Sequence, residues 1–280
     1  MEYLMTYGWA ILIIAVVLGA LFQLGIFNAS TFTPKAPPGA CHVFRPNGPG
    51  TASFINLQGI CNGELPQYVA KFNGASSYVS ATLTSQFANM KYATLCAWIF
   101  MAAASTTYPV IIAEQSSTAW NFNVNPNNYL YAQFRTAGGY NTLLGVTKIP
   151  VSQWTSVCAT YDTNSKINTY VNGVADNSVT ATFTGTLVAG TAAPTVGGGW
   201  TTYWFNGQIA NVQVYNTSLS SNEIKALYNE GIGGAPVALN SLVAWWPLNG
   251  DAKDYSGNNN NGVPTALSFT SSWSSGYSAP

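Results

Sequence analysis

Most of the chain beyond residue 68 is a series of short runs rich in Val, Ile, Thr, Tyr, Phe and Trp, separated by Gly, Asn and Ser turns. This spacing predicts an antiparallel β-sandwich, because each run suits one strand and each polar gap suits one reversal. Asn172-Gly173 predicts a two-residue hairpin turn, since both positions tolerate a positive φ. One short helix is predicted over residues 220–231, which a Ser opens and a Gly ends. The clearest β runs are SYVSATLT, TLCAWIFM, PVIIAEQ, NYLYAQFRT, TSVCATYD, INTYVNGVAD, GQIANVQVYN and SLVAWWPL.

The first 27 residues are a second constraint, since Glu2 is the only charged residue among them. As one helix they would be roughly 40 Å long at about 1.5 Å per residue, enough to cross the roughly 30 Å hydrocarbon layer of a membrane. Apolar residues surround this helix on all sides, so lipid or other helices must enclose it. A signal peptide, a membrane anchor and a filament core are the three explanations. The missing basic start disfavours the first, and the missing positive flanks disfavour the second.

The run MEYLMTYGWAILIIAVVLGALF resembles the N-terminus of archaeal type IV pilin-like proteins, in which a Glu lies near the start of the hydrophobic helix. The resemblance implies a subunit that waits in the membrane and then joins a helical homopolymer outside the cell. In a filament core, Ala15 and Gly19 would let helix backbones approach, and Glu2 would seek a neighbour's N-terminal amine. Relatives carry a basic leader before this run, so a processed or late-started form is expected.

Charged residues make up only 6% of the chain, and nine acids balance nine bases. Phosphate binding needs concentrated Lys and Arg, so nucleic acid is excluded as an expected partner. A surface of hydroxyls and amides changes little with pH or salt, which suits an extracellular location. Asn28-Ala-Ser and Asn216-Thr-Ser are acceptor patterns for N-glycosylation.

The four cysteines favour two disulfides in an oxidising compartment. Zinc is the competing interpretation, but no pair has CxxC spacing and His42 is the only histidine. Cys41 and Cys61 bracket a Gly- and Pro-rich segment and are expected to pair locally. Cys96 and Cys158 would then bridge two strands.

Residues 28–40 contain three prolines and are expected to form a stiff linker between the helix of residues 1–27 and a head of residues 41–280. The head resembles the concanavalin A-like, laminin-G-like jelly roll, whose members include lectins, adhesion modules, glucanases and inert scaffolds. The resemblance implies that fold without choosing among these activities. It is carried by AKFNGASSYV (70–79), TLCAWIF (94–100), QWTSVCATYD with TYVNG (153–173) and GQIANVQVYNTSLSSNEIKALYNEG (207–231).

The stretch VAWWPLNGDAKDYSGNNNNG (243–262) resembles the part that usually opens this domain, although it comes last here. Circular permutation, in which these strands complete the sandwich begun near residue 68, is the preferred explanation. A second copy would be too short to fold. Donation to a neighbouring subunit's sheet is the other option.

Few acidic residues have the pattern of a catalytic site. A glucanase would need carboxylates clustered along one strand. Glu114, Asp162 and Asp176 stand alone, while Glu223 and Glu230 lie on the short helix. The sequence therefore predicts no catalytic residues, no enzyme activity and no cofactor.

Asp251 and Asp254, with Asn249 and residues 258–261, form the one oxygen-rich cluster with the spacing of a calcium loop. The competing interpretation is an Asx-rich turn that satisfies its own backbone. Only two carboxylates are present, which favours the turn over calcium.

Exposed aromatic rings are the usual platforms for sugars, and Trp200, Tyr203 and Trp204 in GGGWTTYWFNG are the candidates. Core packing or a subunit contact is the alternative for these rings.

Together these features predict a mainly β chain with one long N-terminal helix and a circularly permuted jelly-roll head. The function predicted first is a structural pilin of an extracellular type IV pilus-like filament, with adhesive heads outside. The alternative is a membrane-anchored, lectin-like protein that binds surface glycans.

Overall fold

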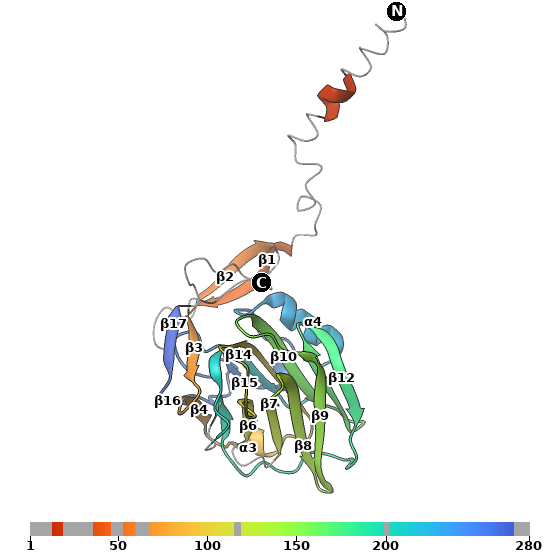
Figure 1. The fold of residues 1–280 in the computed structure, drawn as a ribbon, viewed down its shortest axis with the longest axis vertical. Coiled ribbons are helices and arrows are strands. Elements are labelled where there is room, and N and C mark those ends of the chain that lie inside the picture. The colour runs from red at the N-terminus through yellow and green to blue at the C-terminus, as the bar shows by residue number, and fades with distance from the viewer. Residues whose placement is uncertain are drawn as a thin grey trace, which may run out of the picture.

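The structure is a computed structural model in which two antiparallel sheets pack face to face from residue 68 onward (Figure 1). The eight-stranded sheet has the order β12-β11-β10-β5-β14-β3-β17, with β15 also paired to β14. The seven-stranded sheet has the order β16-β4-β13-β6-β7-β8-β9. The predicted antiparallel sandwich is therefore confirmed. The described residues are 13–18, 36–45, 53–59, 66, 68–114, 119–198 and 202–271, with the backbone alone described for 36–45, 53–59 and 271.

The strands of the eight-stranded sheet are β3 (Tyr68–Asn73), β5 (Ala93–Met101), β10 (Trp154–Tyr161), β11 (Lys166–Val171), β12 (Val174–Thr180), β14 (Asn206–Tyr215), β15 (Leu242–Trp246) and β17 (Ser268–Ser271). Those of the seven-stranded sheet are β4 (Tyr78–Ala81), β6 (Val110–Glu114), β7 (Trp120–Val124), β8 (Tyr129–Thr136), β9 (Gly139–Lys148), β13 (Pro194–Val196) and β16 (Gly262–Thr265). The helical elements of this part are α3 (Ser85–Ala88), α4 (Ser221–Glu230) and the 3-10 turn η1 (Leu239–Ser241).

The hydrophobic core lies between the two sheets, where every second residue of a strand points inward. On β8, Leu130, Ala132 and Phe134 are buried in this core, while Tyr131 and Gln133 alternate with them and are only half-buried. The outer face of the seven-stranded sheet therefore carries the polar and aromatic members of each alternating run. The largest fully buried side chains include Trp120, Trp246, Tyr161, Phe72 and Phe122.

Asp176 on β12 joins the two sheets along one side. Its carboxylate accepts hydrogen bonds from the backbone N–H groups of Thr147 (2.7 Å) and Val146 (3.3 Å) on β9, and from the Thr169 hydroxyl (3.0 Å). Gly145 makes room for this contact, because a Cβ at that position would overlap the carboxylate. Edge N–H groups of β9 that would otherwise be open to another chain are thus occupied.

The C-terminal strands complete the sandwich on the opposite side. β15 pairs with β14, β16 with β4 and β17 with β3, all antiparallel and within this chain. Because β3 and β4 belong to different sheets, β16 and β17 add one strand to each sheet. The pairing agrees with the interpretation that residues 243–262 finish the sandwich begun near residue 68.

Helix α4 covers part of the outer face of the eight-stranded sheet. It begins with the expected Ser220 cap, which forms a capping box with Glu223, and Tyr228 stacks on Trp98 of β5 with ring centroids 5.7 Å apart. The predicted Asn172-Gly173 turn joins β11 to β12, with both residues at positive φ. Both local predictions are confirmed.

Cys96 and Cys158 form a disulfide between β5 and β10, as predicted. The two residues are directly opposite each other in the register, with Cα atoms 4.2 Å apart. Both sulfur-bearing side chains are buried beside residues of α4, including Ile224 and Leu227. The bridge therefore fixes the centre of the sheet on which the helix packs.

The N-terminal region differs in part from expectation. β1 (Ala36–Arg45) and β2 (Ser53–Gly59) pair with each other, and β1 begins inside the segment expected to be a linker over residues 28–40. Of the helix predicted over residues 1–27, residues 13–18 are described; they are helical and exposed. The predictions for Glu2, Gly19, Asn28 and Cys61 lie outside the described residues. Within the described part of the chain, no helix is long and apolar enough to cross a bilayer.

Removing the disulfide should lower stability strongly. The bridge spans 62 positions of sequence, and the chain-entropy model assigns a loop of that length about 4 kcal/mol. We expect the Cys96→Ala/Cys158→Ala double variant to unfold at markedly lower urea concentration with the same far-ultraviolet circular dichroism. Equal unfolding midpoints for the oxidised protein and the double variant would contradict the role given to this bridge.

Alkaline pH should destabilise the fold through Tyr215. Burial raises the pKa of its phenol far above the ordinary value of 10.0, and a hydrogen bond with the Val237 backbone only partly offsets this. The unfolded chain releases the proton near pH 10 and the folded chain does not, so stability is unaffected below pH 10 and falls above it by about 1.4 kcal/mol per pH unit. The free energy of unfolding, measured with urea between pH 8 and 11, should therefore decline less steeply for Tyr215→Phe than for the unchanged protein. The same pH dependence of the unfolding free energy in both proteins would exclude Tyr215 as the cause of the decline.

Candidate functional site

The segment 202–206, which leads into β14, carries two of the three aromatic residues that the sequence singled out. Tyr203 and Trp204 are both half-buried, and they meet different neighbours. The Tyr203 ring lies 6.3 Å from that of Tyr108, whereas the Trp204 ring lies 5.9 Å from that of Tyr78. Trp200 lies outside the described residues.

Trp204 forms one wall of a pocket of about 230 Å³ at this end of the sandwich. The other walls come from the β3–β4 turn and from the loop between β5 and β6. Asn128 holds that loop, because its side-chain oxygen accepts a hydrogen bond from the Ser105 backbone N–H at 3.0 Å. Hydroxyl groups dominate the polar lining, from Ser105, Thr106, Thr107 and Thr202.

Beside the pocket, Tyr108, Tyr131 and Tyr203 form what we call the tyrosine cluster. Tyr108 is its centre, with its ring 5.4 Å from Tyr131 and 6.3 Å from Tyr203. Tyr108 keeps 38% of its surface exposed. The cluster is anchored to the sheet because the backbone N–H of Val110 donates to the Tyr203 carbonyl at 3.0 Å. One open aromatic surface thus lies where the loops meet the outer face of the seven-stranded sheet.

Asn123 lies next to this cluster on β7. It is the cross-strand partner of Tyr131 in the register, and it points to the outer face because its neighbours Phe122 and Val124 are in the core. Its side chain is only 2% exposed, and its amide oxygen accepts no hydrogen bond from the described residues. A buried acceptor left without a donor costs about 1–3 kcal/mol. Asn123 is therefore an enclosed polar group beneath the tyrosine cluster, and the groups open to a ligand are the Tyr108 ring and the pocket hydroxyls.

A row of outward side chains, all polar except Ala113, runs across the strands next to Asn123. The register places one residue from each strand in line along the outer face, at roughly 4.8 Å per strand. Asn121 is 5% exposed within this row. The row consists of Ser80, Thr195, Ala113, Asn121, Gln133 and Thr142.

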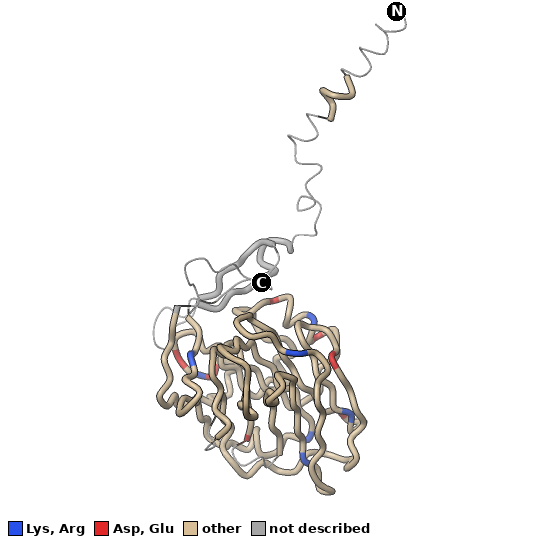
Figure 2. Tube along the Cα trace, in the orientation of Figure 1, with Lys and Arg blue, Asp and Glu red and all other residues tan. Residues whose placement is uncertain are grey.

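The end of the sandwich with the tyrosine cluster carries mainly uncharged groups that can form hydrogen bonds. Burial, and next the neighbouring Tyr108, raise the pKa of Tyr131 above its ordinary value of 10.0. Tyr131 therefore keeps its proton at neutral pH and can donate a hydrogen bond. Lys148 lines a neighbouring pocket with Asn127 and Tyr129. Figure 2 shows how sparse charged residues are over the described head.

The isolated carboxylates of the sequence are tied into local structure. Glu114 is fully buried and accepts a hydrogen bond from the Ala119 N–H at 2.8 Å, and Asp162 accepts one from the Asn164 N–H at 2.8 Å. Glu223 belongs to the capping box of α4. None of these three carboxylates belongs to the tyrosine cluster or lines the pocket beside it.

The oxygen-rich loop of residues 249–261 is built as the Asx-rich turn, the interpretation that the sequence favoured over calcium. Asp254 accepts hydrogen bonds from the backbone N–H groups of Trp245, Ser256 and Asn260 at 2.8–2.9 Å. Asp251 accepts one from the Tyr255 hydroxyl at 2.9 Å. No group of three or more metal-ligating side chains occurs within the described ranges. Calcium binding at this loop stays a prediction.

Sequence reasoning singled out Tyr203 and Trp204 but not Tyr108, Tyr131 or Asn123. One signal for Asn123 was available, since WNFNV places asparagines at alternate positions of a strand, where they are normally depleted. The alternation of apolar and other residues in NYLYAQFRT also predicts which side chains of β8 point outward. Their meeting with Tyr108 depends on a loop and on bulges that no local pattern specifies.

Comparison with solved structures agrees with this architecture. A candidate carbohydrate-binding protein from Bacteroides ovatus has a TM-score of 0.60 and 15% identity, over 80% of this chain and 64% of its own. The present chain thus spans less than two thirds of that protein. A heptameric SAP-like pentraxin from Limulus polyphemus has a TM-score of 0.55 and 14% identity, over 75% of this chain and 97% of its own. At these identities the likeness concerns the fold.

No curated protein sequence matches the chain. The profile of the concanavalin A-like lectin/glucanases superfamily matches residues 73–225, more than half of the 280 residues. The matched range runs from the end of β3 into α4 and includes the tyrosine cluster and Asn123. The chain belongs to the concanavalin A-like lectin/glucanases superfamily.

Proposed function

We propose that the chain is a cell-surface protein that binds glycans without cleaving them, at the end of the sandwich formed by the tyrosine cluster and the Trp204 pocket. The observation that carries the proposal is the exposed ring of Tyr108, which packs with Tyr131 and Tyr203 beside a pocket lined by hydroxyl groups. A saccharide offers hydroxyl donors on its edges and apolar C–H groups on its faces. Both complement this surface.

The proposed contacts follow from the geometry of the cluster. The exposed part of the Tyr108 ring packs against the sugar face. The Tyr131 phenol, whose pKa is raised by burial above its ordinary value of 10.0, donates to a sugar oxygen. The hydroxyls around the pocket supply further exchangeable hydrogen bonds. Glu114, Asp162 and Glu223 serve local structure instead of this site, which supports binding without hydrolysis.

Two further observations support the assignment. The Bacteroides ovatus structure of the same fold is described as a candidate carbohydrate-binding protein. The buried disulfide is typical of proteins that mature in oxidising compartments outside the cytoplasm. We therefore place the glycan-binding head outside the cell.

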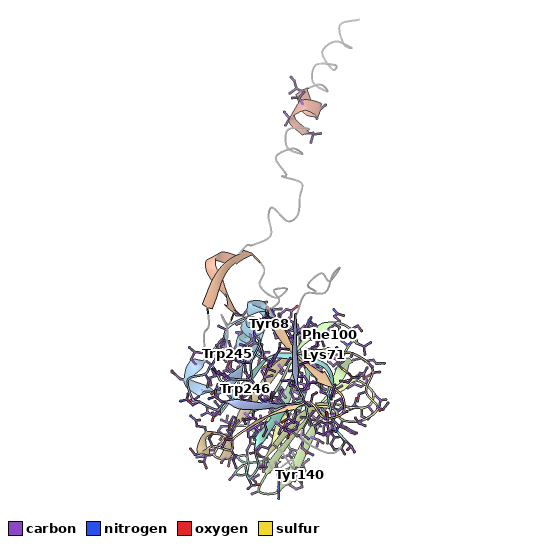
Figure 3. The ribbon with its side chains drawn as sticks, turned by 90° about the vertical axis from the view of Figure 1, so that its left-hand side faces the viewer. Tyr68, Lys71, Phe100, Tyr140, Trp245 and Trp246 are labelled. Carbon is purple, nitrogen blue, oxygen red and sulfur yellow. A yellow bond between two sulfur atoms is a disulfide. The ribbon has the colours of Figure 1, made fainter. Side chains whose placement is uncertain are left out.

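The binding site can be tested with matched tyrosines. A glycan array would identify the bound saccharide, and calorimetry would then measure its affinity. We expect Tyr108→Ala to weaken binding at least 10-fold, which corresponds to about 1.4 kcal/mol. Tyr140→Ala is the control, because Tyr140 is also exposed, at 45%, and lies at the lower end of the head in Figure 3, where it pairs with Arg135 at the end of β8 away from the cluster. A blank array, or equal losses for Tyr108→Ala and Tyr140→Ala, would argue against this site.

A second candidate function is that of a filament subunit, which the N-terminal segment favours. The helical residues 13–18 are all apolar, and Ile13, Ile14, Val16, Val17 and Leu18 are 47–64% exposed. An apolar helix with no polar side must be surrounded by lipid or by other helices. Packing between copies of this segment, including Ala15, would place glycan-binding heads on the outside of a polymer.

Glu2, the only charged residue among residues 1–27, provides the test of the filament function. A carboxylate in an apolar bundle requires a positive partner, so Glu2→Gln should reduce the yield of sheared surface filaments several-fold without changing the thermal midpoint of the head. Tyr3→Phe, the neighbouring change without loss of charge, is the control. Normal filaments from Glu2→Gln, or chain recovered only as detergent-extracted monomer, would leave the anchored glycan-binding protein as the function.

A further inference from the structure

Asn216 is the described member of the two N-glycosylation patterns, and its place in the fold is suited to modification. It directly follows β14 and its side chain is exposed. Buried residues anchor the chain on both sides of it, with Tyr215 fully buried and Leu219 only 2% exposed. The acceptor side chain is thus displayed on a short bend with fixed ends.

Thr94 on β5 organises this bend from inside the sandwich. Its hydroxyl donates to the Thr217 carbonyl at 2.7 Å and accepts from the Leu219 N–H at 2.8 Å. The backbone N–H of Asn216 donates to the Ser241 carbonyl at 2.9 Å. The backbone of the acceptor sequence is therefore satisfied without the Asn216 side-chain amide.

Asn216 differs in this respect from many other asparagines of the head. Asn73, Asn125, Asn172 and Asn211, for example, use their side chains to hold turns or bulges through hydrogen bonds to nearby groups. No described residue forms a side-chain hydrogen bond with Asn216. Its amide nitrogen is left available for reaction.

A pocket of about 370 Å³ begins beside the acceptor sequence. Thr217 and Ser218 form its near side, and Tyr92, Asn168 and Tyr170 belong to the rest of its lining. Hydroxyls, an amide, two aromatic rings and the carboxylates of Asp162 and Glu223 line it, and all of these groups can contact a sugar. Asn216 is not part of this lining, but its neighbour Thr217 is, so a sugar on Asn216 would start at the pocket's rim.

We propose that Asn216 carries an N-linked oligosaccharide whose first residues pack into this pocket. The amide nitrogen attacks the anomeric carbon of a saccharide carried on a lipid phosphate, so that a C–N bond forms while the bond from that carbon to the phosphate oxygen breaks. The lipid phosphate leaves with the electron pair, and one amide proton passes to a base of the transferring enzyme. Ser218 supplies the hydroxyl that the acceptor pattern requires.

The attached glycan would not obstruct the proposed glycan-binding site. Tyr203 and Trp204 precede the first residue of β14, whereas Asn216 follows its last. Ten residues of strand separate the two by about 30 Å at roughly 3.3 Å per residue. The modification is therefore independent of glycan binding at the other end, and either can hold without the other.

Intact-mass and glycopeptide mass spectrometry of the chain from the cells that make it tests this modification. We expect a mass above that of the sequence, with the added saccharide on Asn216. Asn216→Gln and Ser218→Ala should abolish it, and Ser218→Thr, which keeps a hydroxyl, should retain it. An unmodified Asn216, including a chain modified at Asn28 alone, would overturn the proposal.

Backbone hydrogen exchange tests separately whether the sugar packs into the pocket. Backbone amide hydrogen exchange of residues 217–221 should be several-fold slower in the modified chain than in Asn216→Gln. Tyr92→Ala should preserve occupancy at Asn216 while removing that difference. Equal exchange rates with and without the saccharide would show that the glycan extends into solvent instead.

Discussion

Strand β14 is the element on which the rest of the structure depends. On one edge it pairs with β5, and on the other it pairs first with β3 and then with β15. The change of partner occurs at a bulge where Asn211 adopts a positive φ of 50°. The Asn211 side-chain oxygen accepts hydrogen bonds from the Trp245 indole (2.7 Å) and the Gln213 amide (3.0 Å), and its nitrogen donates to the Gly234 carbonyl (3.0 Å). One buried asparagine thus joins the central strand, the C-terminal strand and the loop after α4.

This arrangement is the one that a circular permutation of the sandwich requires. β3 and β15 share the same edge of β14, so the two ends of the sandwich sequence lie beside one another, and the Tyr68 N–H donates to the Asn249 side chain at 2.8 Å. Joining or cutting the chain at such a place leaves the pairing of every strand unchanged. The order of strands in space, rather than in sequence, defines the core.

Features that depend on neighbouring residues could be predicted from the sequence. The Asn172-Gly173 turn, the capping box of α4 and the alternation of buried and outward residues on β8 all follow from short-range geometry. The pairing of Cys96 with Cys158 followed from the small number of cysteines. The tyrosine cluster could not be predicted, because Tyr108 reaches Tyr131 only through a long loop and register shifts near Val110 and Tyr129. Nor does a pattern reveal that the Asn123 oxygen lacks a donor, since that depends on every neighbour in space.

The scarcity of charge gives these uncharged contacts their importance. In a chain with 6% charged residues, several carboxylates serve the backbone: Asp176 joins two sheets, Asp254 holds the loop after β15 and Glu223 caps α4. Asp162 and Glu223 are among the groups that line the pocket beside Thr217, whereas the Trp204 pocket is lined by amide, hydroxyl and aromatic groups. Such a surface discriminates ligands by the positions of hydroxyl groups, because an unmatched buried polar atom costs more than a hydrogen bond contributes. β14 runs from the uncharged Trp204 pocket at one end to the pocket beside Thr217 at the other, so the strand that organises the core also sets the distance between them.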